Sequence, residues 1–281
     1  MKERVIFQDF NELWANHVLA STSERMKNDQ AEQNFWKEFM EKKIGYQPDP
    51  SSRPVAEFLK KIIKENQVNS VLELGPGWGN YTLDLAQSCD TVECVDISED
   101  VLQFIQKIGK EHHYNNIQTR HIKWEDFSEN KKYDMVFGYN CFYRLADLKA
   151  CFEKMTKYSK KICVVGMNSG VAPAWVQEIN QAGIKVSWEW KDYIYFVNVL
   201  YQMGFDPQVK VLPFCKQFVY SDEESLLQGE CRRIGAELQE EKKEKVLKIL
   251  LKYFKKQEGG YCATAYFHSG IVSWNPNQIK E

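Results

Sequence analysis

Apolar residues along the chain follow two alternating patterns, short uninterrupted runs and longer runs that repeat every three or four positions. After Pro54, for example, Val55, Phe58, Leu59 and Ile62 fall on one face of a helix. The expected strands are Ser70–Leu74, Thr91–Asp96, Ile117–Ile122, Asp134–Tyr139, Lys161–Met167 and Gln208–Leu212. Helices are expected over Tyr81–Ser88, Glu99–Glu111, Leu148–Tyr158 and Tyr193–Met203. Strands that alternate with helices predict βαβ units, and therefore a doubly wound α/β fold with a parallel sheet.

Both ends of the chain and two internal stretches interrupt this alternation. The first fifty residues are helical and aromatic, with a possible capping box at Asp29 and Glu32, and we expect an arm or lid there. The less regular stretch Asn168–Asp192 is expected as an insertion over the sheet edge. A turn at residues 268–270 is expected to separate Tyr261–Phe267 from the short strand Ile271–Trp274. The expected domains are residues 1–50 as the arm, 51–219 as the sheet core, 220–258 as a helical insertion and 259–281 as a C-terminal strand.

The most informative stretch is VLELGPGWG, residues 71–79, in which an apolar strand runs into a turn with glycine at every second position. Glycine has no Cβ, so it can adopt positive φ and let the backbone approach a ligand closely. Glu73 lies near the end of the strand, at the carboxyl edge of the sheet, where open α/β folds bind their ligands. The pattern therefore predicts a cofactor-binding turn.

A second acid supports this prediction and helps to select the cofactor. Asp96 ends a strand about 20 residues after Gly75, where α/β folds place a carboxylate that accepts hydrogen bonds from ribose hydroxyls. A dinucleotide fingerprint requires a third glycine three residues after the second, and Asn80 stands there instead. With Glu73 before G-x-G-x-G, the stretch resembles the first motif of the class I S-adenosylmethionine-dependent methyltransferases. The alternative, in which Glu73 and Asp96 only cap helices, stays open.

The resemblance extends over roughly Phe58–Met167 and implies a mostly parallel seven-stranded sheet whose last strand is antiparallel, with helices on both faces. In this family the glycine loop wraps the methionine part of the cofactor, and the acid at the strand end helps to hold its amino group. Glu73 has that place here. The cofactor-binding residues that the resemblance implies are Glu73, Gly75, Pro76, Gly77, Gly79, Asp96, Ile97, Trp124, Glu125, Tyr139 and Asn140.

The chain departs from the family pattern after the third strand. The family usually has an acid there that reads the adenine amino group, but Lys123 occupies this position. Glu125 or Asp126 is a possible substitute, and Trp124 is a possible wall against the adenine ring. It is equally consistent with the sequence that Trp124 is a core residue and the two acids are surface residues.

Composition narrows the possible partners. A net charge of −2 and a pI near 6.3 give no basic face for nucleic acid. No apolar run reaches the roughly 18 residues of a membrane span, and the charged N-terminus is unlike a signal peptide. The eight cysteines form no C-x-x-C pair and lie mostly in apolar runs, which is typical of reduced thiols, so we expect no metal site and a cytoplasmic location.

These observations lead to the hypothesis of an enzyme that transfers a methyl group from S-adenosylmethionine to a small-molecule acceptor. Methyl transfer by in-line displacement depends mainly on alignment, so a catalytic residue need not be visible. His17 and Tyr143 are the candidates for a general base. Aromatic residues in the expected lid segments favour a flat or cationic acceptor; they are Trp14, Trp36, Trp175, Trp188, Trp190, Tyr193 and Tyr195.

Other functions remain open at this level. A non-catalytic cofactor-binding or assembly protein on the same fold is favoured only by Lys123, and a nicotinamide-dependent oxidoreductase is disfavoured by Asn80. A protein-methylating enzyme is a further alternative. A metalloid methyltransferase would need thiols in one pocket, and Cys141 is the cysteine best placed for that. The sequence gives no indication of an oligomeric state.

Overall fold

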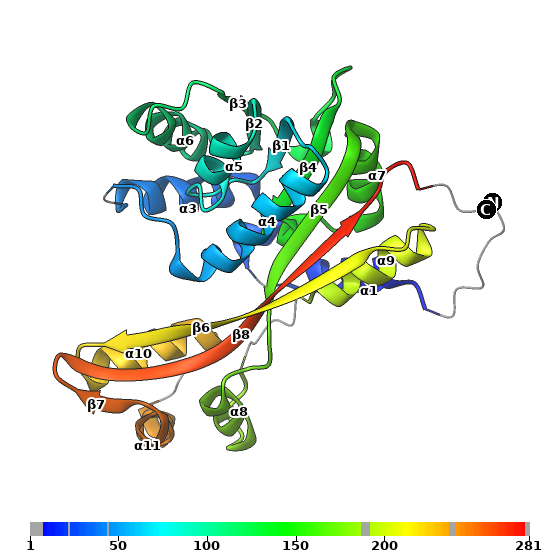
Figure 1. Ribbon diagram of the computed structural model, residues 1–281. Coiled ribbons are helices and arrows are strands. Elements are labelled where there is room, and N and C mark those ends of the chain that lie inside the picture. The colour runs from blue at the N-terminus through cyan, green and yellow to red at the C-terminus, as the bar shows by residue number, and fades with distance from the viewer. Residues whose placement is uncertain (1–7, 22, 44, 187–191, 236–239, 279–281) are drawn as a thin grey trace. The chain divides into compact units, whose positions relative to one another are not determined.

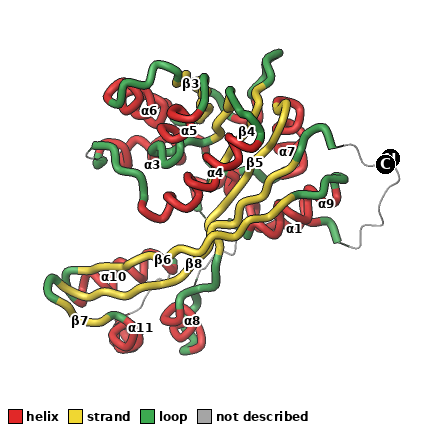
Figure 2. The backbone as a smooth tube through the Cα atoms, in the orientation of Figure 1, coloured by secondary structure: helices red, strands yellow, loops and turns green. Residues whose placement is uncertain are grey.

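The computed structural model describes residues 8–21, 23–43, 45–186, 192–235 and 240–278 (Figures 1 and 2). The chain divides into two compact units, each assembled from separate stretches of sequence. The first unit comprises Met1–Asn168, Asp192–Leu212 and Ser269–Glu281, and the second comprises Ser169–Lys191 and Pro213–His268.

The first unit is built on a mostly parallel sheet. Its strands are β1 (Ser70–Leu74), β2 (Thr91–Asp96), β3 (Ile117–His121), β4 (Tyr133–Tyr139) and β5 (Ser159–Ser169), with the ends of β6 (Gln208–Tyr220) and β8 (Gly260–Trp274). The spatial order is β3-β2-β1-β4-β5-β8-β6, and β1 to β5 pair in parallel. The order reverses next to β1, which places the end of this strand at a topological switch point where α/β folds bind ligands. The predicted α/β fold is confirmed.

Helices cover both faces of this sheet because successive residues of each buried strand point to opposite sides. Val71 packs into a core with α4, α5 and α6, whereas Leu72 packs into a second core with α1, α7 and α9. The helices on the first face are α4 (Arg53–Glu65), α5 (Thr82–Ser88) and α6 (Glu99–Glu111). Those on the second face are α1 (Phe10–Ala20), α7 (Leu148–Tyr158) and α9 (Tyr193–Gln202). The bounds of α5, α6, α7 and α9 agree with the expected helices to within one residue.

The N-terminal arm continues with the short helix α2 (Glu24–Lys27) and with α3 (Asp29–Glu41). The expected capping box is wrong by one residue: the side chain of Asn28 caps α3, since its Oδ1 accepts from the backbone N–H groups of Gln30 and Ala31. Asp29 and Glu32 therefore do not cap the helix, and their side chains make contacts elsewhere. A 3₁₀ helix, η1 (Pro50–Ser52), then joins the arm to α4; two more, η2 (Trp124–Asp126) and η3 (Phe142–Arg144), follow β3 and β4.

The second unit contains α8 (Ala174–Gln181), α10 (Glu223–Ile234), α11 (Glu240–Tyr253) and β7 (Lys255–Gln257), with the remaining parts of β6 and β8. Strand β7 pairs antiparallel with β8. Trp175 is the centre of its core, where it packs against Phe218 and Phe254, and its indole N–H donates to the buried Glu230 at 2.8 Å. Trp188 and Trp190 lie outside the described residues.

The expected turn at residues 268–270 is wrong, because β8 runs without interruption from Gly260 to Trp274. Ser269 is buried and its hydroxyl donates to Asn168 Oδ1 at 3.4 Å. A Cβ on Gly270 would lie 2.0 Å from Cδ1 of Tyr193. The glycine therefore makes room for a tyrosine ring beside a strand and does not mark a chain reversal.

Two further findings concern the environment of the protein. All eight cysteines are unpaired. Across the part of the chain that the structure describes, every helix is too short or too polar to cross a membrane. The expected cytoplasmic location stays a prediction.

Candidate active site

The glycine turn after β1 adopts the backbone conformation that its sequence predicts. Gly75, Gly77 and Gly79 all have positive φ, between +55° and +82°. The turn is tied to β2 by a hydrogen bond from the Gly75 N–H to the Val95 carbonyl at 2.9 Å. A Cβ on Gly75 would lie 2.5 Å from Cβ of Cys141, so the residue can only be glycine in this packing.

A cavity of about 360 Å³ lies beside this turn, entirely within the first unit. Most of the predicted site residues line it, namely Glu73, Gly75, Pro76, Gly77, Asp96, Ile97, Trp124, Glu125, Tyr139, Asn140 and Tyr143. The arm completes its wall with Arg25, Glu32, Phe35 and Trp36. Its volume is within the range of small-ligand sites, about 300–1,000 Å³.

Glu73 is fully buried under the glycine turn. Its carboxylate accepts from the Thr82 hydroxyl at 2.7 Å and from the Cys94 thiol at 3.4 Å. Burial raises the pKa of Glu73 to about 7, against the lowering effect of these two hydrogen bonds, and the nearby charge of Asp96 adds to the rise. Because ionised carboxylates are seldom buried without a cation, this group is suited to receive a positively charged ligand atom.

Asp96 lies at the end of the neighbouring strand. Its Oδ1 accepts from the backbone N–H of Ser98 at 2.8 Å, while Ser98 itself is the N-cap of α6, so Asp96 is not a helix cap. Burial raises the pKa of Asp96 to about 7, the Ser98 hydrogen bond lowers it, and the negative charge of Glu32 raises it again. The charge of Glu32, which lies on the arm, therefore affects the protonation of Asp96 at the strand edge.

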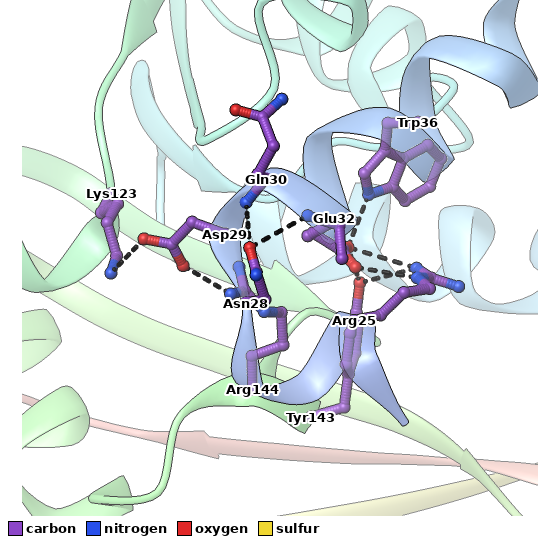
Figure 3. A network of polar contacts seen from close by, with 10 residues as sticks. Arg25, Asn28, Asp29, Gln30, Glu32, Trp36, Lys123, Tyr143 and Arg144 are labelled. Atoms are coloured by element: carbon purple, nitrogen blue, oxygen red, sulfur yellow. Dashed lines mark hydrogen bonds and ion pairs between the residues drawn. The ribbon is translucent and has the colours of Figure 1, made fainter. Parts of the chain in front are cut away.

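The arm supplies a carboxylate that pairs with Lys123, the residue at the position where the family usually has an acid. Asp29 accepts from Lys123 Nζ at 2.8 Å and from Arg144 at 2.5 Å (Figure 3). Asp29 itself is not one of the described residues that line the cavity, whereas Lys123 and Arg144 are. The lysine that replaces the expected acid is therefore neutralised from outside the cavity.

Next to Lys123, Trp124 is buried and stacks on Phe127 with ring centroids 5.4 Å apart. It is thus a core residue and also part of the cavity wall, and the two alternatives from the sequence are compatible. Both acids are exposed, and of the two only Glu125 lines the cavity in the described structure.

Residues at the end of β4 are held by a network from β5. The Tyr139 hydroxyl donates to Asn168 Oδ1 at 2.7 Å, and Asn140 Oδ1 accepts from the backbone N–H of Asn168 at 2.8 Å. Asn140 adopts positive φ, which asparagine tolerates better than most residues. Tyr139 and Asn140 both line the cavity.

Glu32 organises the inner surface of the arm (Figure 3). Its carboxylate is only 2% exposed and accepts from Arg25 at 2.8 Å, from the Trp36 indole N–H at 2.8 Å and from the Tyr143 hydroxyl. Burial opposes ionisation, but these donors hold the pKa of Glu32 below its usual value. Burial and the charge of Glu32 raise the pKa of Tyr143, which favours the protonated phenol; its role as a general base stays a prediction.

Two predicted residues lie elsewhere. His17 is exposed on α1 and shares a hydrogen bond of 3.0 Å with the Tyr195 hydroxyl, and it does not contribute to the cavity wall. Gly79 faces α6, because a Cβ there would lie 2.8 Å from Ile108. Of the described aromatic residues in the expected lid segments, Trp36 lines the cavity, whereas Trp14 and Trp175 belong to hydrophobic cores.

Several lining residues were missed from the sequence. Trp78, Asn80 and Tyr81 continue directly from the glycine turn and could have been expected from their position. Arg25, Glu32 and Phe35 come from the arm, and Arg144 from η3. These four belong to no motif, and only the packing of the arm brings them to the site.

Comparison with known proteins identifies the family. A family model described as a methyltransferase domain matches residues 71–161, which contain the glycine turn, Asp96 and β4. This part of the chain is a methyltransferase domain, and the fold that contains it is the class I methyltransferase fold. Its cofactor is S-adenosylmethionine, as the resemblance implied. No curated protein sequence matches the methyltransferase.

Solved structures confirm the fold of this methyltransferase. The YcgJ protein from Bacillus subtilis is 10% identical, with a TM-score of 0.55 over 80% of this chain and 98% of its own. A putative methyltransferase from Bacillus halodurans is 15% identical, with a TM-score of 0.53 over 79% of this chain and 100% of its own. Magnesium protoporphyrin IX methyltransferase from Synechocystis, with bound SAH, is 11% identical, with a TM-score of 0.53 over 90% of this chain and 99% of its own.

Proposed function

We propose that this methyltransferase binds S-adenosylmethionine along the carboxyl edge of β1 and β2 and methylates a small molecule held between α3 and the end of β4. The observation that carries the proposal is that one cavity is lined both by Glu73 and Asp96 and by aromatic residues of the arm. The first group suits the cofactor and the second suits an acceptor.

On the cofactor side, the glycine turn passes along the methionine part, and the Glu73 carboxylate attracts the ammonium group. Asp96 accepts hydrogen bonds from the ribose hydroxyls, and Trp124 lies against the adenine. The remaining contacts that we assign to the cofactor are those of Gly75, Pro76, Gly77, Ile97, Glu125, Tyr139 and Asn140. Gly79 supports the turn indirectly by letting α6 approach.

On the acceptor side, the wall is aromatic and its charges are paired. Phe35, Trp36 and Tyr143 line it, and the guanidinium of Arg25 is already bound by Glu32. Such a wall favours a flat aromatic or cationic group, and its enclosure by the arm favours a small molecule over a protein chain. The reaction depends mainly on alignment: the nucleophile forms its bond to the methyl carbon as the carbon–sulfur bond breaks, and its proton passes to water.

Two experiments test this proposal. Isothermal titration should show binding of S-adenosylmethionine and S-adenosylhomocysteine but not of NAD, with much weaker binding by Asp96→Ala. A cell extract incubated with the enzyme and methyl-labelled cofactor should then carry label in the fraction that passes a small-pore filter. Label confined to retained protein or nucleic acid would overturn the assignment of a small-molecule acceptor.

A further inference from the structure

The helix α3 is held over the cavity by different forces at its two ends. Its C-terminal half rests on aromatic contacts, since Phe39 stacks on Trp78 at 5.1 Å and Trp36 lies 6.3 Å from the same ring. Its N-terminal half is held by polar contacts, because Asp29 and Glu32 reach η3 and the loop after β3 (Figure 3).

The two carboxylates differ in their exposure. Asp29 is 43% exposed, and its partners Lys123 and Arg144 are 37% and 16% exposed, so solvent and salt reach Asp29 and above all its contact with Lys123. Glu32 is almost completely buried, and its carboxylate accepts from both the Arg25 guanidinium and the Tyr143 hydroxyl. One contact is therefore an outer, salt-sensitive attachment and the other an inner, buried one.

The same segment also forms part of the cavity wall. Arg25, Phe35 and Trp36 line the cavity, and a Cβ on Gly77 would lie 3.3 Å from the Trp36 ring. A cofactor that touches the glycine turn is then covered by α3. A ligand that is covered by a helix exchanges with solvent when the helix moves away, and such openings often limit enzyme turnover.

We propose that Asp29 and Glu32 are positioning residues that fix α3 over the bound cofactor, so that breaking either contact opens the N-terminal half of this helix and releases the cofactor. The inference rests on the proposed function, since it assumes a cofactor in this cavity. Glu32 has a second effect, because it also orients the Tyr143 hydroxyl and the Arg25 side chain on the acceptor side.

The test measures the dissociation rate of S-adenosylhomocysteine by stopped flow in the intact chain and in Asp29→Asn, Glu32→Gln and the control Glu38→Gln. Glu38 is an exposed acid on the same helix. We expect dissociation about threefold faster for Asp29→Asn and at least tenfold faster for Glu32→Gln, with no change for Glu38→Gln. In about 1 M salt, where the Debye length falls to about 3 Å, Asp29→Asn should match the unmodified protein, whereas Glu32→Gln should remain fast.

Equal rates in all four proteins at low salt would overturn the inference and make α3 a fixed wall. A purely structural role would lower the melting temperature without changing the dissociation rate measured well below it, and this result would also overturn it. If Glu32→Gln fails to fold, Asp29→Asn still decides, because its side chain is exposed. If the unmodified protein does not bind S-adenosylhomocysteine at all, the proposed function fails first, and the two failures are distinguishable.

Discussion

Substituting Glu73 by glutamine should make folding stability less dependent on pH while it weakens cofactor binding. The carboxyl group is fully buried, and its pKa rises from the ordinary 4.5 to about 7 on folding. The folded protein therefore holds the proton more tightly than the unfolded chain, so stability decreases as the pH rises through this interval. A shift of this size corresponds to about 3 kcal/mol, of which about 2.5 kcal/mol is lost between pH 5 and pH 8.

The measurement is urea unfolding of the ligand-free protein, followed by circular dichroism at pH 5 and pH 8. A buried amide has its own cost, about 1–3 kcal/mol if a donor stays unpaired, but this cost is the same at both pH values. The difference in the free energy of unfolding between Glu73→Gln and the unmodified protein should therefore shift by about 2.5 kcal/mol in favour of the variant between pH 5 and pH 8. Glu38→Gln serves as the control. An unchanged difference across this range would refute the argument that Glu73 is buried at the expense of stability, and unchanged cofactor affinity at pH 8 would refute its role in binding.

Three further outcomes follow from other parts of the structure. Gly75→Ala should lose cofactor binding and about 2–5 kcal/mol of stability, because alanine disfavours the positive φ and its Cβ would overlap Cys141. Partial recovery of stability in a double variant with Cys141→Gly, read by thermal melting, would confirm the steric part. Glu230→Ala should destabilise the second unit by about 3–5 kcal/mol, since it removes the buried carboxylate that accepts from Arg233 and from the Trp175 indole N–H. Amide exchange within α8 and α10 should reveal it, in contrast to unchanged exchange in β1. In native protein, a thiol reagent should modify the exposed Cys215 before the buried Cys94, because burial raises the pKa of Cys94 well above its usual value. The reverse order, read by mass spectrometry of peptides, would contradict this.

The sheet and the glycine turn could be predicted from the sequence because their signals are local. A buried parallel strand such as β1 is an unbroken apolar run, and a turn with three glycines has few other uses. Asp96 followed from its distance along the chain from Gly75. The strand bounds of β1 and β2 were accordingly predicted to the residue.

The parts that could not be predicted depend on contacts between distant segments. Glu32 has an ordinary helical sequence context, and its burial results from Tyr143, which follows it by more than one hundred positions. Gly270 resembled a turn residue because the ring of Tyr193, which occupies the space of a Cβ, is also remote in sequence. Lys123 appeared to break the adenine motif, since the acid that balances it belongs to the arm.

The second unit is made from two stretches of chain, and this has a practical consequence for anyone who wishes to dissect the enzyme. Trp175 comes from the first stretch, while Phe218, Phe254 and Glu230, which surround it, come from the second. Deletion of either stretch alone would remove core residues against which the other stretch packs. Removal of this unit requires two excisions with two new joints, one replacing residues 169–191 and one replacing residues 213–268.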